Sequence, residues 1–232
     1  MATGTALSRR ERLRAQTLAE IREHGYAQIA EGGPTALSLN GIAKAMGMSG
    51  PGLYRYFASR DELLATLVTE SYEDLAETLE HAAEQARRRP PEARLRAVAD
   101  AFRAWALAQP HRYRLVFGST YGSGELDPDR IIPAAHRAMG VLLRALADLT
   151  PDPAPPVGDA TLRRQLVEWA GNRPDNLQLD PGVLALGVLG WTRLHGVISM
   201  EIEGILEPTG IDPARIYGAE IEHLVAQRTG RA

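Results

Sequence analysis

Nearly every long segment of this chain places its apolar residues three and four positions apart, and no segment alternates apolar and polar residues as a strand does. Because a period of 3.6 residues belongs to the α-helix and a period of two to the strand, the sequence predicts an all-α protein. Gly and Pro residues divide it into about ten helices. The 232 residues are 44% hydrophobic and 24% charged, a balance that excludes disordered and collagen-like chains.

The chain contains no cysteine. This excludes disulfide scaffolds, thiolate zinc sites, iron–sulfur clusters and cysteine nucleophiles, and it favours a reducing compartment. No apolar stretch follows the charged N-terminal residues as it would in a signal peptide, and the apolar run at 181–192 is too short to span a bilayer. We therefore expect a cytoplasmic protein with no metal and no cofactor.

The charge is distributed unevenly along the chain. Residues 1–60 contain eight Lys or Arg and four Glu, whereas residues 61–232 contain 18 basic and 25 acidic residues. The basic N-terminal part is therefore the candidate surface for binding a polyanion.

Residues 38–64, SLNGIAKAMGMSGPGLYRYFASRDELL, are the most informative about function. Ser38 can cap a short helix, Gly47 can supply the positive φ that ends it, and Ser49 can cap a second helix directly afterwards. Two short helices that meet across a tight turn are the layout of a helix-turn-helix, whose second helix enters the major groove of DNA. The capping box at 59–62 then predicts the start of a long helix.

A long helix, expected at about 8–31 and followed by EGGP, precedes this segment. Together with LSLNGIAKAMGMS, GPGLYRYF and SRDELL, it makes residues 13–68 resemble the DNA-binding domain of the tetracycline-repressor (TetR) family of bacterial regulators. GWTRLHGVISMEIEG at 190–204 is similar to the Trp, His-Gly (WHG) signature of one ligand-binding subtype in that family. The resemblance implies a three-helix DNA-binding domain at 1–58, joined by a long helix to an effector-binding and dimerisation domain at 59–232.

The second short helix supplies the main candidates for contact with DNA. Arg55 can donate two hydrogen bonds to O6 and N7 of guanine and so read a base; a phosphate contact or a free surface arginine is the alternative. The resemblance implies that Tyr54 and Tyr56 donate their hydroxyl protons to phosphate oxygens, with packing in the core as the alternative. The expected DNA-binding residues are Ser38, Lys44, Ser49, Gly50, Pro51, Gly52, Tyr54, Arg55, Tyr56 and Arg60.

A run of arginines at the start of the first helix is a further candidate for contact with DNA. Arg9, Arg10 and Arg12 can form an arm that reaches the minor groove or the DNA backbone. A solvated charged tail is the more common outcome for such a run.

Aromatic residues recur at helical spacing in the rest of the chain. A filled core is the ordinary explanation of this pattern, and a cavity between helices is the alternative. The family resemblance favours a cavity for a small apolar or amphipathic effector. The expected effector-binding residues are Phe102, Trp105, Tyr113, Trp191 and His195.

The segment at about 182–206 is apolar almost all round and contains several glycines. A helix of this kind must be covered on most sides. Together with a final helix at about 213–228 it is the predicted homodimer seam, and a helix buried within its own chain is the alternative. Two recognition helices one DNA turn apart, about 34–36 Å, would then read a pseudopalindrome.

No convincing catalytic pattern is present. The histidines are scattered, and Glu220-x-x-His223 lacks the second copy that a di-iron bundle requires. The glycine-rich run at 117–125 lacks the Lys-Ser/Thr ending of a phosphate loop. We therefore predict a homodimeric, ligand-responsive repressor of transcription that binds operator DNA and is not an enzyme. The alternatives are a helical carrier or enzyme that keeps the helix-turn-helix as a scaffold, and a regulator with a filled second domain and no effector.

Overall fold

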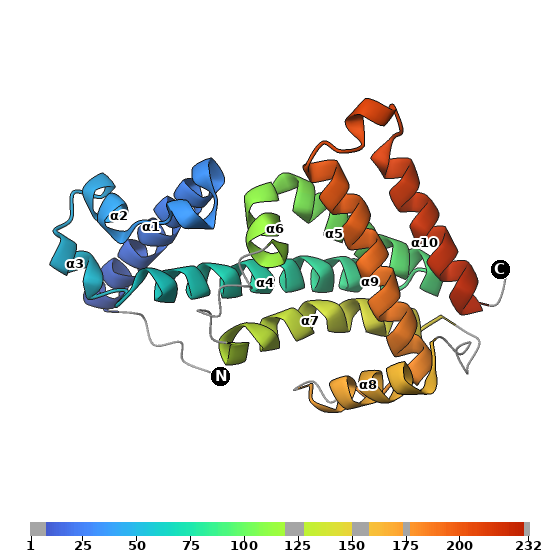
Figure 1. Ribbon diagram of the computed structural model, residues 1–232. Helices are drawn as coiled ribbons and strands as arrows, with labels where there is room; N and C mark the ends of the chain where they lie inside the picture. The colour runs from blue at the N-terminus through green and yellow to red at the C-terminus, as the bar shows by residue number, and fades with distance from the viewer. Residues whose placement is uncertain (1–7, 119–127, 150–157, 174–176, 230–232) are drawn as a thin grey trace. The chain divides into compact units, whose positions relative to one another are not determined.

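The computed structural model of the chain describes residues 8–118, 128–149, 158–173 and 177–229, and these residues contain helices and no strand (Figure 1). The predicted all-α class is therefore confirmed. Most of the glycine-rich run at 117–125 lies outside the described residues. The α-helices are α1 (Arg9–Gly32), α2 (Leu39–Ala45), α3 (Gly50–Tyr54), α4 (Arg60–Gln85), α5 (Pro91–Ala108), α6 (Pro110–Phe117), α7 (Pro128–Ala147), α8 (Ala160–Gly171), α9 (Pro181–Ile202) and α10 (Pro213–Thr229).

The helices form two compact units. The first unit consists of Met1–Ser71 and His111–Pro128, so that it holds α1 to α3, the first half of α4, and α6. The second unit consists of Tyr72–Pro110 and Asp129–Ala232 and holds the rest of α4 with α5 and α7 to α10. The division falls within α4, and a functional boundary between residues 58 and 59 stays a prediction.

The buried face of α1 is the one that its periodicity predicts, and it contains Ile21, Gly25 and Ile29. A Cβ atom at Gly25 would lie 3.0 Å from Cδ1 of Leu67 on α4. The absence of a side chain therefore lets α4 approach the backbone of α1 closely.

Serine side chains cap the starts of α2, α3 and α4. The side chains of Ser38, Ser49 and Ser59 each accept a hydrogen bond from the backbone N–H three residues later, at 3.2, 3.2 and 3.0 Å. Gly47 has φ +65° between α2 and α3, a conformation that other residues rarely adopt. Capping chemistry in the sequence thus predicts correctly where the helix-turn-helix begins and turns.

In the second unit α9 packs between other helices of the same chain. Leu143 of α7 occupies the space above Gly187, and Cδ2 of Leu224 on α10 lies 2.8 Å from where a Cβ of Gly190 would be. Two of the glycines that the sequence assigned to a dimer seam are therefore used within the chain.

The apolar helix α9 is longer than the apolar run at 181–192 predicts. It runs from Pro181 to Ile202 with a mean hydropathy of 1.4 over its most apolar 18 residues, which by length and composition alone is enough to cross a membrane. The expectation that this segment is too short to span a bilayer therefore does not hold for the whole of α9. Nearly half of that window is buried within the unit, and core helices of soluble proteins have the same property.

Polar contacts that the sequence did not predict connect α5 to α9 and α10. Nε of Arg103 donates to Oε2 of Glu201 at 2.8 Å, and the ion pair raises the pKa of the guanidinium. The buried hydroxyl of Tyr217 donates to the carbonyl oxygen of Ala99 at 2.6 Å. These contacts fix α5 against the C-terminal helices.

Leu53 holds α3 in place, and it is 0% exposed. The substitution Leu53→Ala should destabilise the first unit by about 2–5 kcal/mol, because it removes buried methyl groups and leaves a cavity. Urea denaturation followed by far-ultraviolet circular dichroism should show a lower midpoint. Leu13→Ala is the matched control, since Leu13 is 56% exposed and its midpoint should hardly move. Equal shifts for the two variants would contradict this packing.

Candidate nucleic-acid interface

The segment after α2 combines a buried anchor with exposed polar residues. Leu53 and Phe57 are 0% and 5% exposed, whereas Tyr54 is 48% exposed. Arg55 is exposed as well, and Tyr56 is half-buried. The backbone is therefore held from inside the unit while Tyr54 and Arg55 extend into solvent.

The second helix of the motif is shorter than the sequence suggested. α3 ends at Tyr54, Arg55 is its C-cap, and Tyr56 lies beyond it. Two glycines and a proline in five residues make a weak helix, which explains the early end. Arg55 and Tyr56 thus leave from the end of α3 and not from its exposed face.

The two glycines of α3 have different surroundings. A Cβ at Gly50 would meet only Oδ1 of Asn40, at 3.9 Å. Gly52 is buried, and a Cβ there would lie 3.0 Å from Oγ of Ser49 and 3.9 Å from Nη2 of Arg55. Gly52, which the sequence included among the DNA-binding residues, is thus covered by neighbouring side chains, whereas Gly50 keeps an open face.

Several of the expected DNA-binding residues lie at the surface of this unit. Ser38 and Ser49 are exposed, and their hydroxyl groups cap α2 and α3. Lys44 and Pro51 are exposed as well. All four are accessible to a partner of the first unit.

Arg60 has a structural role that the sequence did not predict. Its Nε donates to the carbonyl of Leu37 at 3.2 Å, Nη2 donates to the carbonyl of Pro34 at 2.7 Å, and Nη1 pairs with Asp61 at 2.9 Å. The guanidinium group joins the segment between α1 and α2 to the start of α4. These bonds use three of the five N–H donors of the group, and a contact of Arg60 with phosphate stays a prediction.

A hollow of about 630 Å³ lies between the start of α1 and the end of α3. The guanidinium carbon of Arg14 lies 5.2 Å from the centre of the Tyr56 ring, which is a cation–π contact. The arginines expected as an arm or a tail are helical, because a capping box at Ser8 starts α1 at Arg9. The residues that line this hollow, named here the α1–α3 groove, are Arg9, Arg10, Leu13, Arg14, Thr17, Arg55 and Tyr56.

Two family models match the chain. One, described as "Bacterial regulatory proteins, tetR family", matches residues 21–67, and the other, "Tetracyclin repressor-like, C-terminal domain", matches residues 95–224. The chain belongs to the TetR family. It is thus a member of a family of DNA-binding transcriptional regulators, as the sequence predicts, whereas the WHG subtype is not confirmed.

Individual relatives extend over nearly the whole chain. The HTH-type transcriptional regulators Rv1816 of Mycobacterium tuberculosis and Mb1846 of Mycobacterium bovis are each 32% identical over 231 residues, 95% of this chain and 95% of theirs. The crystal structure of SCO4313 has a TM-score of 0.77 at 38% identity and covers 94% of this chain and 98% of that one. PfmR, a TetR family regulator from Thermus thermophilus, shares the fold with a TM-score of 0.54 at 20% identity, over 90% of this chain and 96% of its own.

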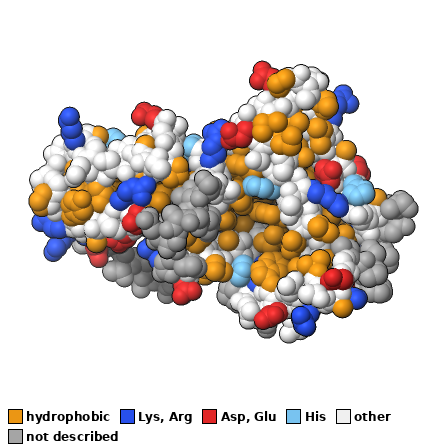
Figure 2. All heavy atoms as spheres, viewed as in Figure 1, with side chains coloured by type: hydrophobic (Ala, Val, Ile, Leu, Met, Phe, Trp, Pro, Cys, Tyr) orange, Lys and Arg blue, Asp and Glu red, His pale blue; other side chains and the backbone are white. Residues whose placement is uncertain are grey.

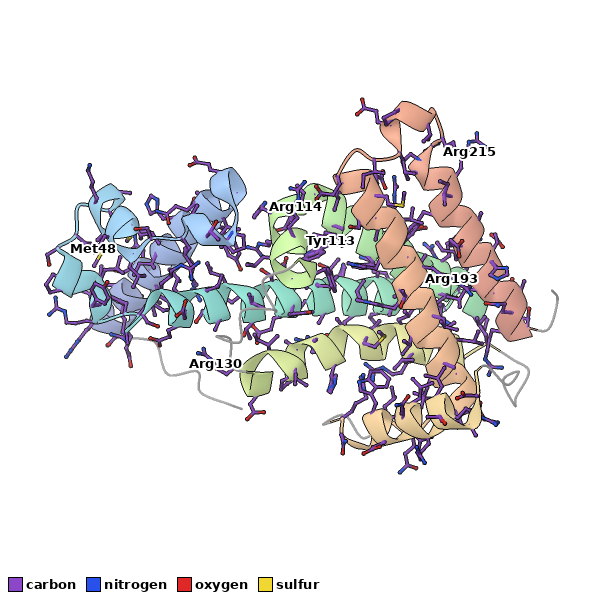
Figure 3. All side chains as sticks on the ribbon, viewed as in Figure 1. Met48, Tyr113, Arg114, Arg130, Arg193 and Arg215 are labelled. Atoms are coloured by element: carbon purple, nitrogen blue, oxygen red, sulfur yellow. The ribbon has the colours of Figure 1, made fainter. Side chains whose placement is uncertain are left out.

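The residues that the sequence assigned to effector binding in this TetR-family protein do not all lie in one unit. Tyr113 is on α6 (Figure 3), in the first unit. The centre of its ring lies 5.1 Å from that of Phe117. In the second unit the rings of Phe102 and Trp191 stack with their centres 4.7 Å apart. The indole N–H of Trp105 donates to Oδ2 of Asp74 at 2.8 Å.

Burial divides these five residues into two groups. Phe102, Trp105 and Tyr113 are buried. Trp191 and His195, one turn apart on α9, are half-buried and accessible to a ligand. Burial lowers the pKa of His195, because desolvation disfavours its charged form.

The second unit also contains an apolar hollow of about 460 Å³ that the sequence did not predict. It lies where α8 meets the segment before α9 and the start of α9. Sequence reasoning missed it, because the segment before α9 has no helical periodicity to place its leucines. The lining residues are Val167, Ala170, Gly171, Leu177, Gln178, Leu179 and Leu184.

The pKa of His195 predicts how acid affects stability. Because that pKa is lower in the folded chain than in the unfolded one, the unfolded chain takes up the proton first as pH falls below about 6.5. His195 therefore adds to the loss of stability between pH 7.5 and pH 5.5. The melting temperature of His195→Gln should fall less over this interval than the melting temperature of the wild type. An equal loss in both proteins would contradict the proposed cause.

Proposed function

We propose that the protein is a repressor of transcription that binds a pseudopalindromic operator as a homodimer and releases it when a small molecule binds. The observation that carries the proposal is the pair Tyr54 and Arg55, exposed at the end of an α3 that is anchored by buried residues. The excess of basic residues in the first 60 positions supports the same surface. This assigns DNA binding to residues 1–58, effector binding and dimerisation to 59–232, a cytoplasmic location and no enzymatic activity.

Within this proposal the residues around α3 divide between base reading and backbone contact. Arg55 donates to a guanine, where a bidentate contact discriminates by about 1–3 kcal/mol. The hydroxyl groups of Tyr54 and Tyr56 donate to phosphate oxygens and fix the register without reading sequence. Ser38, Lys44, Ser49, Gly50, Pro51 and Arg60 complete the proposed surface.

Variants of Arg55 and Tyr54 test these roles. Gel shifts over a salt series, with a duplex selected from a random pool by the wild-type protein and with random DNA, should give a slope near −7 in log K against log salt for a dimer that neutralises about eight phosphates. Arg55→Ala should lose preference at one base position, because it removes a base contact. Tyr54→Phe should weaken binding to both duplexes alike, because it removes a phosphate contact.

Two results would contradict the proposal at different levels. Equal losses on selected and random DNA for Arg55→Ala would refute base reading and leave a phosphate contact. An absence of salt-dependent binding to any duplex by the wild type would refute the DNA-binding role. Turnover or tight binding of a small molecule by that same protein would then favour the helical enzyme or carrier.

The exposed side of α9 supports a dimer seam along α9 and α10. Nothing lies within 4 Å of where a Cβ of Gly196 would be, whereas Gly187 and Gly190 are covered by side chains of their own chain. Thr192 and Met200 are exposed on the same side of the helix. Hydrophobic side chains are exposed over α9 in Figure 2. A second copy that covers this stripe would bury it, and Gly196 would let the two helices approach closely.

Adding a charge at Gly196 should disrupt this seam. Gly196→Arg places a long charged side chain where the partner helix is proposed to lie, and arginine is a better helix former than glycine, so the single chain should remain folded. Light scattering should give a mass of 25.2 kDa for the variant and twice that for the wild type. Leu107→Arg, at an exposed position of α5, adds the same charge and should remain dimeric. A dimeric Gly196→Arg would contradict the seam.

The effector is proposed to be an apolar or amphipathic molecule that binds the second unit beside Phe102, Trp191 and His195. Pockets for such molecules have apolar walls and a few polar groups, and the stacked rings with the half-buried imidazole of His195 supply both. The effector releases DNA only if it binds better to the conformation in which the recognition helices have the wrong spacing. A thermal-shift screen of hydrophobic compounds tests this, since a ligand at 100 times its Kd adds about 2.7 kcal/mol of stability.

A further inference from the structure

The arginines of the α1–α3 groove differ in their contacts from other arginines of the protein. Arg22, Arg103 and Arg137 each pair with a glutamate of the same unit. Among the described residues, by contrast, none of the four arginines that line the groove makes an ion pair with a carboxylate. Like charges that share a groove without a counter-charge repel one another, so an anion that enters it is stabilised.

The α1 side of the groove has the form of a stripe along the helix. Arg9, Arg10, Leu13, Arg14 and Thr17 follow a spacing of three and four, which places them on one face. At a rise of 1.5 Å per residue, this face is about 12 Å long. Since one strand of duplex DNA carries a charge every 3.4 Å along the helix axis, the stripe is long enough for about three successive phosphates.

The positive charge in this groove comes from arginine side chains and not from free backbone N–H groups at the start of α1. The capping box already uses the first turn: Oγ of Ser8 accepts from the N–H of Glu11, and Oε2 of Glu11 accepts from the N–H of Ser8 at 2.7 Å. An anion here would therefore meet guanidinium groups. Guanidinium groups are the side chains best suited to phosphate, because they donate two parallel hydrogen bonds.

Contact between Arg14 and Tyr56 joins the two sides of the groove. The guanidinium group lies over the ring, and a cation–π contact does not use its N–H groups as hydrogen-bond donors to an oxygen. Leu13, which is largely exposed, gives the groove an apolar part against which a sugar can pack. Cationic edges beside an apolar strip match the alternating phosphates and sugars of a nucleic-acid strand.

We propose that the α1–α3 groove binds the sugar–phosphate backbone of one strand of duplex DNA, so that the first two turns of α1 extend the DNA contact beyond the helix-turn-helix. The inference rests on the proposed function and adds to it the α1 side of the groove, which carries affinity but no sequence preference, whereas Arg55 at the α3 side reads a base. Arg9 and Arg10 contact phosphates directly, and Arg14 is a positioning residue that holds Tyr56.

Salt dependence of DNA binding by the full chain tests the groove. The double variant Arg9→Ala/Arg10→Ala removes four guanidinium groups from a dimer, so the slope of log K against log salt should become shallower by about 3 to 4. Affinities for random DNA and for a duplex selected by the wild type should fall by the same factor. Arg9→Lys/Arg10→Lys should keep the wild-type slope, because it keeps the charge.

Arg88→Ala/Arg89→Ala is the matched control, since it removes the same charge from exposed positions that follow α4. It should leave the slope unchanged. Should the alanine pair in the groove melt earlier than the wild type, Arg9→Gln/Arg10→Gln keeps the first three carbons of both side chains and a polar end without the charge, and should give the same shallower slope.

The outcomes separate this inference from the proposed function. If the wild type shows no salt-dependent binding to any duplex, the proposed function fails, and the groove proposal fails with it. If the wild type binds and the alanine and glutamine pairs keep its slope, the groove proposal alone is overturned. A loss confined to the selected duplex would also overturn it, because that result assigns Arg9 and Arg10 to base reading.

Discussion

The burial of Leu53 is the constraint on which the DNA-binding surface depends. A helix of five residues such as α3 is far below the length at which an isolated helix is stable in water. It exists because Ser49 caps its start and because Leu53 and Phe57 are enclosed by the first unit. The same burial directs Tyr54 and Arg55 outward, so the core residues of α3 determine which polar residues a partner can reach.

Local chemistry explains what could be predicted from the sequence. The caps at Ser38, Ser49 and Ser59 depend on atoms three residues apart, so the sequence locates these helix starts well. Arg60 is different, since its partners include carbonyl groups 23 and 26 residues earlier in the chain. No spacing rule predicts such a contact, and a surface role is then the default expectation for an arginine.

The contacts of the α1–α3 groove and of the expected effector-binding residues also join residues far apart in sequence, which spacing along the chain cannot predict. Arg14 and Tyr56 are far apart in sequence, and only the folded unit brings a guanidinium group of α1 over a ring beyond α3. The aromatic residues raise another difficulty, because a filled core and a ligand cavity both need apolar walls at helical spacing. The stack of Phe102 on Trp191 and the bond from Trp105 to Asp74 appear only once the helices are packed.

The tryptophans lie in only one of the two units, so the intrinsic tryptophan fluorescence of the protein reports on that unit. All three, Trp105, Trp169 and Trp191, belong to the second unit, whereas the first unit contains tyrosine but no tryptophan. Emission excited selectively from indole therefore originates only in the unit to which effector binding is assigned. Changes there can be followed without any signal from the DNA-binding residues, and a single tryptophan introduced into the first unit of a chain without the other three would report on that unit alone.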